Sequence, residues 1–256
     1  MWTPNLKTPF GLTVIMRRSV LLELNVVPCT LIERLNRFVA IVTVNGQTGK
    51  ALVTNTGRLE EFMVPGRKAL CTPKTGGKTD FVLVAFEDLG GKGAVIDTRT
   101  QAKAFERAVE LGLVPWLRGC RIKRKEIKVG RSRLDYLFEC PEGEVYAEMK
   151  SAVLRGGEKG EYAMYPDCPS VRGQKHIREL IELSREGKRA MIFFIGALPG
   201  VTKFKPYGEG DPEIERLLNE AKKAGVEIHA MSISLLPSGK VVIENPCLQI
   251  ELGENF

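Results

Sequence analysis

The chain has 256 residues and a mass of 28.4 kDa, enough for one large domain or two small ones, and its 43% hydrophobic and 27% charged residues argue against disorder. No apolar run approaches the roughly 18 residues of a membrane helix, and the apolar stretch near the N-terminus is too short for a secretory signal. The net charge of +7 favours a polyanionic partner. We therefore expect a soluble, cytoplasmic protein with no membrane partner. The sequence leaves open whether translation starts at Met1 or Met16.

The first third of the chain is predicted to form short strands separated by turn signals. The dipeptide Asn45-Gly46 is typical of a tight hairpin turn, and one helical turn is expected near residues 59–63. Four to six such strands suit a small closed β-barrel, so we expect an OB-like domain over residues 1–90 that ends in a glycine-rich linker. The strands are expected at 19–26, 37–44, 50–54, 68–72 and 81–87.

The pattern changes after residue 90. Some segments repeat apolar residues at helical spacing, and others are strand-length apolar or alternating runs, which predicts an α-β-β-β-α-β core for residues 91–256. The fold class is therefore a β-barrel followed by a mixed α/β domain. Helices are expected at 98–111, 173–186 and 212–224, strands at 121–129, 133–140, 144–151, 188–196, 226–234 and 240–243, and a glycine-rich loop at 155–173.

A basic strip lies at the start of this second region. Eight Lys and Arg residues and one Glu stand between Arg118 and Arg133, so this segment alone has a charge of +7 and the rest of the chain sums to zero. Such a concentration is typical of a nucleic-acid-binding surface, and the alternative is a strand face that only meets solvent. The residues from which we expect DNA contacts are Arg121, Lys123, Arg124, Lys128, Arg131 and Arg133.

The hairpin after this strip carries a constellation of charged side chains. Glu148 and Lys150 share one face of a strand, because side chains alternate along it. A four-residue turn at 141–144 would place Asp135 opposite Lys150, within one register step, and diagonal to Glu148. We therefore expect Asp135, Glu148 and Lys150 to converge at one end of the hairpin.

The chemistry of this set points to phosphodiester hydrolysis. Asp135 and Glu148 would supply hard oxygen ligands for Mg²⁺ or Mn²⁺, and Lys150 would position the attacking water or stabilise the transition state. An Asp…Glu-x-Lys set in an α-β-β-β-α-β core is the pattern of PD-(D/E)XK nucleases, whose fold resembles restriction endonucleases. The alternative for the bare Glu-x-Lys tripeptide is an exposed cross-strand salt bridge.

Other candidates surround this set. Glu106, on the first helix, is a candidate third acid, or else a solvated helix residue. Gln174 and Lys175 open the next helix beside Arg172, where a helix N-terminus attracts phosphate. His176 could assist, but a lone histidine on a helix more often serves packing or lies at the surface. Asp167 could be a further metal ligand, but we expect a turn carboxylate in a loop. In the barrel, the candidate DNA contacts are Arg34, Arg37 and Arg58, and Phe38 is either a base-stacking platform or a core residue.

The cysteines do not suggest a metal site. Six cysteines are scattered without a Cys-x-x-Cys spacing, and the chain has only two histidines. A structural zinc site needs clustered soft ligands. We expect reduced, mostly packed thiols.

Six segments carry a family resemblance, at 34–38, 55–66, 132–137, 148–151, 165–167 and 172–180. In order and spacing, from about residue 30 to 235, they resemble the sugar fermentation stimulation protein A family. The resemblance implies an N-terminal OB-like domain, a C-terminal nuclease-like domain, DNA binding and a link to sugar-utilisation genes.

Two functions remain open. The first is a divalent-metal-dependent DNA endonuclease, which the complete Asp…Glu-x-Lys set favours. The second is a non-catalytic DNA-binding regulator of sugar (maltose-type) utilisation genes that keeps the nuclease core as a scaffold, which the family's name favours. The oligomeric state is also open, a homodimer included.

Overall fold

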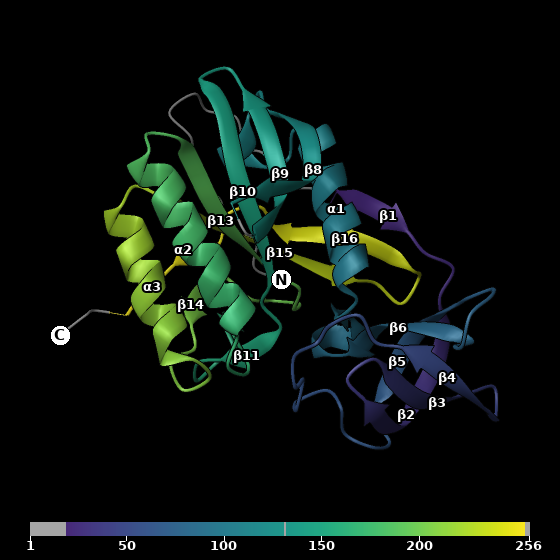
Figure 1. The fold of residues 1–256 in the computed structure, drawn as a ribbon. Helices are drawn as coiled ribbons and strands as arrows, with labels where there is room; N and C mark the ends of the chain where they lie inside the picture. Colours follow the sequence, from purple (N-terminus) through teal and green to yellow (C-terminus); the bar gives the residue numbers. More distant parts are fainter. Residues whose placement is uncertain (1–18, 131, 254–256) are drawn as a thin grey trace.

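The computed structural model describes residues 19–130 and 132–253, so Met1, Met16 and Arg131 lie outside the described residues. A small barrel and a larger region of sheet and helices lie side by side (Figure 1). No helix within the described residues is long and apolar enough to cross a bilayer.

The barrel is a five-stranded closed sheet. Its strands pair in the order β4-β3-β2-β5-β6, and pairing of β4 with β6 closes the ring. Burial alternates along β3, as expected for a strand with one face in a core. The β3–β4 turn is Asn45-Gly46, as predicted, and both residues have positive φ. The strands are β2 (Val27–Asn36), β3 (Val39–Val44), β4 (Gln47–Leu52), β5 (Lys68–Pro73) and β6 (Phe81–Glu87).

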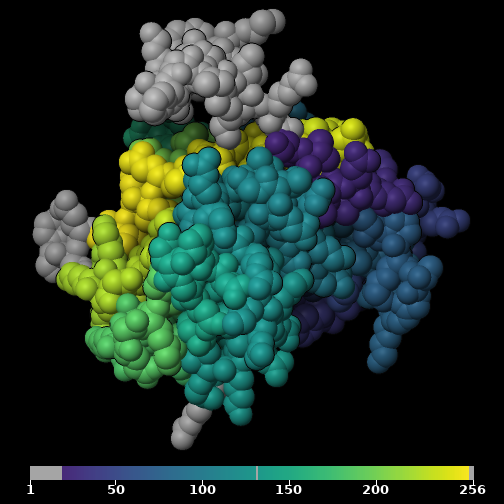
Figure 2. Space-filling model, turned by 90° about the horizontal axis from the view of Figure 1, so that it is seen from above, coloured from purple at the N-terminus to yellow at the C-terminus, as the bar shows by residue number. Residues whose placement is uncertain are grey.

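The first strand differs from the prediction. β1 (Val20–Glu23) does not join the barrel but pairs with β16 (Lys240–Asn245) near the other end of the chain. The purple segment accordingly lies beside the yellow one in the view from above (Figure 2). The barrel begins instead with β2, which we missed because Pro28 suggested a strand end. Pro28 is the second residue of β2, where proline is tolerated.

The larger region contains a mixed sheet with helices on both faces. β10, β13 and β15 are parallel, and β9 and β8 extend the sheet antiparallel to a free edge at β8. β13 is central and almost wholly buried, as its apolar run predicts. The sheet elements are β7 (Gly93–Val95), β8 (Arg121–Val129), β9 (Ser132–Cys140), β10 (Gly143–Ser151), β13 (Arg189–Gly196), β15 (Glu227–Leu235) and β16.

The three helices divide between the two faces. Phe105 of α1 (Thr98–Glu110) stacks on Phe193 of β13, with ring centroids 4.2 Å apart. α2 (Val171–Arg185) packs against β9, β10 and β13, and α3 (Pro212–Lys223) packs against α2 (Figure 1). The α-β-β-β-α-β order was predicted correctly because each of these elements carries a clear apolar period.

The predicted glycine-rich loop at 155–173 was wrong, because this segment contributes strands to a second sheet. These strands are too short to show a period. The second sheet consists of β11 (Leu154–Gly156), β12 (Tyr162–Tyr165), β14 (Lys203–Pro206) and β17 (Gln249–Ile250). Two 3-10 turns occupy Leu89–Gly91 and Pro115–Leu117.

The cysteines also differ from expectation, because Cys120 and Cys140 form a disulfide. They lie beside the Arg121–Glu139 pair of β8 and β9, so the sheet register brings together two residues 20 positions apart. Sequence spacing alone gave no sign of this contact. The free thiols of Cys29 and Cys71 are buried, as expected.

Candidate active site

The β9–β10 hairpin brings the predicted carboxylates together. Cys140 pairs with Gly143 across a two-residue turn, and the register continues to Tyr136 opposite Ala147. Continued by one step, it sets Asp135 opposite Glu148, two positions from the predicted pairing with Lys150. The prediction erred because it assumed a four-residue turn. A shift of two preserves the face, so the side chains of Asp135 and Glu148 still lie on the same side of the sheet.

Each carboxylate is held by the backbone of the opposite strand. The backbone N–H of Asp135 donates to Glu148 Oε2 at 3.3 Å, and the N–H of Met149 donates to Asp135 Oδ2 at 2.8 Å. These reciprocal bonds fix both side chains near the middle of the sheet. The two acids are therefore neighbours through the fold and not through flexible side chains.

Two basic groups complete the cluster. Lys150 Nζ donates to Glu148 Oε1, and His176 Nδ1 contacts the same oxygen from α2. Lys150 Nζ also lies 3.5 Å from His176 Nδ1. The side chains of Glu148, Lys150 and His176 are only 2%, 12% and 4% exposed, whereas Asp135 is half-buried. Glu148 and His176 are thus the most deeply buried members of this cluster, and Asp135 and Lys150 are partly exposed.

The electrostatics of the cluster follow from its burial. Burial and the neighbouring Glu148 charge raise the pKa of Asp135 to about 6. Burial alone would raise the pKa of Glu148, but Lys150 and His176 outweigh it and the pKa is lowered. Burial likewise opposes the charge of Lys150, yet the Glu148 carboxylate raises its pKa, so the amine stays protonated. At neutral pH the cluster therefore brings two carboxylates together with the Lys150 ammonium and the His176 ring.

The donor set suits a hard cation with few protein ligands. No group of three or more His, Cys, Asp or Glu side chains in the described residues is arranged to hold a metal. Asp135 and Glu148 alone offer two carboxylates, and Mg²⁺ in enzymes that act on phosphates is commonly held by one or two carboxylates with water and substrate. The residues therefore fit a cation of this kind, and they do not form a complete protein cage.

His176 is the member that sequence reasoning undervalued. We expected a packing role, and its ring is indeed buried, but its Nδ1 atom reaches Glu148. A signal was present in the sequence. His176 occupies the buried stripe of α2 with Gly173, Leu180 and Ile177, where a polar residue needs a polar partner.

Glu106 does not join this cluster. Its Oε1 accepts from Tyr136 Oη at 3.2 Å, and its Oε2 pairs with Lys125 at 2.6 Å. Tyr136 follows Asp135 and therefore points to the opposite face of the sheet, toward α1. Burial and the nearby Glu106 charge raise the pKa of Tyr136, so its hydroxyl remains a donor. Glu106 thus lies across the sheet from the candidate site.

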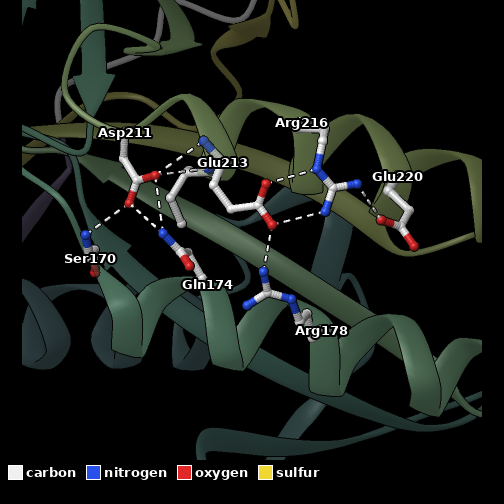
Figure 3. A network of polar contacts seen from close by, with 8 residues as sticks. Ser170, Gln174, Arg178, Asp211, Glu213, Arg216 and Glu220 are labelled. Carbon is white, nitrogen blue, oxygen red and sulfur yellow. Dashed lines mark hydrogen bonds and ion pairs between the residues drawn. The ribbon is translucent and has the colours of Figure 1, made fainter.

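Gln174 is also turned away. Its side-chain amide donates to both oxygens of Asp211, the N-cap of α3, at 3.2 and 3.0 Å (Figure 3). Asp211 also accepts from the backbone N–H of Ser170, so this network joins the starts of α2 and α3. Arg172 and Lys175 are exposed on the first turns of α2. Their predicted phosphate contacts remain predictions.

The basic strip is partly neutralised. Four of its basic residues form ion pairs with acidic side chains. The pairs are Arg121–Glu139, Lys123–Glu144, Lys125–Glu106 and Arg133–Glu126. Within the described part of the chain, Arg124 and Lys128 are exposed cations of β8 for which no acidic partner occurs. These two are therefore the cations of β8 best placed to meet a phosphate.

The predicted barrel contacts divide into two kinds. The Arg34 guanidinium donates to the backbone carbonyls of Gly57 and Arg58 at 2.9 and 2.6 Å, so it braces the loop that follows β4. Arg37 and Arg58 are exposed, and Phe38 is 53% exposed and not a core residue. The DNA contacts of these residues stay predictions.

A small pocket lies where this barrel loop meets the larger region. The Asp167 carboxylate accepts from the Leu59 backbone N–H at 2.8 Å, so it anchors the loop rather than joining the carboxylate cluster. The pocket has a volume of about 280 Å³. Its lining includes Arg58, Leu59, Val153, Asp167 and Tyr207, and Val153 stands just beyond the end of β10.

The comparisons with known proteins agree with this architecture. The family model described as the SfsA N-terminal OB domain matches residues 32–96, and the sugar fermentation stimulation protein RE domain matches residues 99–239. The predicted barrel and restriction-endonuclease-like domain are therefore confirmed.

Named relatives cover most of the chain. A sugar fermentation stimulation protein homolog of Pyrococcus furiosus is 60% identical, and the match covers 84% of this chain and 92% of the homolog. The Archaeoglobus fulgidus homolog is 43% identical, and the match covers 88% of this chain and 96% of the homolog. A solved structure of Pyrococcus furiosus SfsA in complex with Ca²⁺ has a TM-score of 0.87 and 57% identity, and covers 91% of this chain and 99% of that chain. The chain therefore belongs to the sugar fermentation stimulation protein family.

Proposed function

We propose that the protein hydrolyses DNA phosphodiester bonds at the Asp135 cluster, with one divalent cation held by Asp135 and Glu148. The observation that carries this proposal is the placement of two carboxylates side by side. Asp135 and Glu148 lie on one face of the β9–β10 hairpin, with the backbone of each strand bonded to the other's acid, beside Lys150. Their mutual repulsion contributes to the raised pKa of Asp135, and a cation bound between them would relieve it.

The nature of the ligands supports Mg²⁺ or Mn²⁺. Both donors are carboxylate oxygens, which hard cations prefer. The relative from Pyrococcus furiosus was solved with Ca²⁺, another hard divalent cation, and it is 57% identical to this chain. When bound, such a cation stabilises charge on a phosphoryl oxygen and lowers the pKa of a coordinated water.

The chain's own residues have separate tasks in this proposal. Lys150 remains protonated, so it acts as a fixed positive charge that stabilises the negative charge of the phosphate in the transition state. Glu148 holds Lys150 in place through Oε1. Asp135 is half-buried and lies beside Glu148, where the cation would bind.

DNA is the substrate that the surface favours. Arg124 and Lys128 are exposed on β8, two strands from β10 in the same sheet, and contacts to phosphate oxygens need only such unpaired cations. Arg37 and Arg58 offer further exposed cations on the barrel. Binding through these residues would be largely independent of sequence.

A second function is supported by a different observation. Glu148 and Lys150 are almost completely buried and bonded to each other, as in a cluster that only stabilises the fold. Together with the relatives' names, this favours a DNA-binding regulator of sugar-utilisation genes that retains the nuclease core as a scaffold. In that case the two acids would have no role at a phosphate.

The test is a cleavage assay on single-stranded and double-stranded DNA with Mg²⁺, Mn²⁺ or a chelator. We expect cleavage that requires the metal, is lost in Asp135→Asn and persists in Glu106→Gln, a matched acid on the other face of the sheet. DNA binding without cleavage under every metal condition would contradict the nuclease and support the regulator. Cleavage that survives in Asp135→Asn would move the active site elsewhere.

A further inference from the structure

His176 occupies a position that packing alone does not require. It lies in the second turn of α2, and its ring is buried between the helix and the sheet at 3% exposure. Gly173, one turn before it, lies against the Tyr165 hydroxyl, where an added Cβ would come within 2.5 Å. This close packing holds the first turn of α2 against Tyr165 at the end of β12.

The contact between His176 and Glu148 fixes the position of one proton. Nδ1 lies within hydrogen-bond distance of Glu148 Oε1. A lone pair on Nδ1 would face the lone pairs of Oε1, which already accepts from Lys150, so the favourable arrangement places a proton on Nδ1. His176 therefore donates from Nδ1, and Lys150 is the second donor to the same oxygen.

Two donors hold one oxygen of Glu148, and the other is directed to β9. With Oε1 held by Lys150 and His176, Glu148 can turn neither of its oxygens without losing a bond in a site that excludes water. Oε2 is thereby directed to the strand that carries Asp135, whose backbone N–H lies 3.3 Å away. Lys150 and His176 thus resemble the residues that hydrogen-bond and orient metal ligands in other proteins.

We propose that His176 is a positioning residue, whose Nδ1–H fixes Glu148 beside Lys150 and presents Oε2 to the cation. This inference rests on the proposed function, because it assigns His176 a role toward the metal that Asp135 and Glu148 would hold. His176 itself touches neither the cation nor the substrate.

The other histidine provides a contrast within the same chain. His229 lies flat on Trp116, with ring centroids 4.8 Å apart and an interplanar angle of 2°. Its ring is one quarter exposed, and its nearest carboxylate, on Glu227, is 3.5 Å from Nε2. This is a stacked histidine of β15 away from the cluster, so His229→Asn is a suitable control.

The test uses two substitutions that differ in where they place an amide. His176→Asn puts an N–H donor at the position of Nδ1, whereas His176→Gln places it near the position of Nε2. We would titrate Mn²⁺ into the full-length wild type, both variants and His229→Asn, and check each fold by circular dichroism. We expect His176→Gln to lose about 10-fold in Mn²⁺ affinity, as for other outer partners of metal ligands, and His176→Asn and His229→Asn to stay close to wild type.

Three results would overturn the inference. If wild type binds Mn²⁺ and His176→Gln binds it equally well, His176 has no positioning role and the proposed function stands. If both His176 variants lose the same affinity with an intact fold, donation from Nδ1 is not the cause. If wild type neither binds Mn²⁺ nor cleaves DNA, the proposed function fails and the inference fails with it.

The proton can be tested without any metal. Because the chain has two histidines, His229→Asn leaves His176 as the sole source of imidazole nitrogen signals. A long-range ¹H–¹⁵N spectrum of this variant in chelator should show a protonated Nδ1. An unprotonated Nδ1 would contradict the contact itself, whatever the outcome with metal and DNA.

Discussion

An acidic group lies beside a lysine on each of the two faces of the sheet around β9. On the α2 face, half-buried Asp135 and buried Glu148 lie beside Lys150. On the α1 face, Glu106 pairs with Lys125, whose side chain is 55% exposed. Asp135 and Tyr136 are adjacent in sequence, yet they belong to opposite clusters because strand side chains alternate.

The two clusters differ in charge balance and in solvent. The α1-face pair is balanced, one acid to one lysine, and water screens it. The α2-face cluster gathers two carboxylates around Lys150 and His176 where water is largely excluded, so each charge depends strongly on its neighbours. Similar residue types can thus form a surface ion pair or a candidate metal site according to burial and to the number of acids that are gathered.

The largest expected effect is that of removing the buried lysine. Lys150→Met leaves two buried carboxylates without their cation, and we expect a loss of about 3 kcal/mol in the free energy of unfolding at pH 7.5 in chelator. Lys125→Met, its matched control on the α1 face, should cost less than about 1 kcal/mol. Urea unfolding of both variants measures the difference. Equal costs would show that the two clusters are energetically alike.

The next effect concerns Asp135 in the metal-free protein. Its pKa is raised from 3.8 to about 6, so the folded state binds its proton more tightly than the unfolded state. Below pH 3.8 Asp135 is protonated in both states and does not lower the free energy of unfolding. As pH rises from 3.8 to about 6, ionisation of Asp135 lowers the free energy of unfolding, and above about 6 the loss is complete. Asp135→Asn should accordingly stabilise the metal-free protein by about 2 kcal/mol at pH 7.5 and by little at pH 4.

Thermal and urea unfolding from pH 4 to 8 in chelator would measure this gain. Glu106→Gln is the control, and it should leave the pH profile close to that of wild type. If Asp135→Asn destabilises the protein at pH 7.5, then Lys150 and His176 neutralise the site fully and no excess charge is left for a cation.

The smallest effect concerns DNA binding by the edge strand. Removing Arg124 and Lys128 should flatten the dependence of log affinity on log salt by about 0.9 for each phosphate that the variant no longer neutralises. Removing Arg121 and Lys123, which already have acidic partners, should change it less. Binding of a duplex measured over a series of salt concentrations compares the two double variants. Equal slopes would show that pairing does not decide which cations meet DNA.

Much of the site was predictable because strand periodicity is simple. The apolar residues Val145, Ala147 and Met149 identify the other face of β10, so Glu148 and Lys150 had to share a face. The register error of two residues did no harm, since an even shift keeps each side chain on its face. An error of one would have separated Asp135 from Glu148.

The remaining features depend on contacts between distant segments. The apolar pattern of α1 does not indicate which face of the sheet the helix covers. Glu106 was therefore considered as a third acid beside Asp135 and Glu148, although it lies on the opposite face of the sheet. The Cys120–Cys140 disulfide depends on the β8–β9 register, and the placement of β1 depends on a partner strand near the other end of the chain. His176 could have been recognised as a polar residue in an apolar stripe, but its partner required the fold.

The most direct test of the central claim is a calorimetric titration of Mn²⁺ into the metal-free wild type, Asp135→Asn and Glu106→Gln. If the α2 face holds the cation, wild type and Glu106→Gln should each bind one ion per chain with similar affinity, and Asp135→Asn should show no binding at that site. If none of the three proteins binds Mn²⁺, or if Asp135→Asn binds it as wild type does, then Asp135 and Glu148 do not form a metal site.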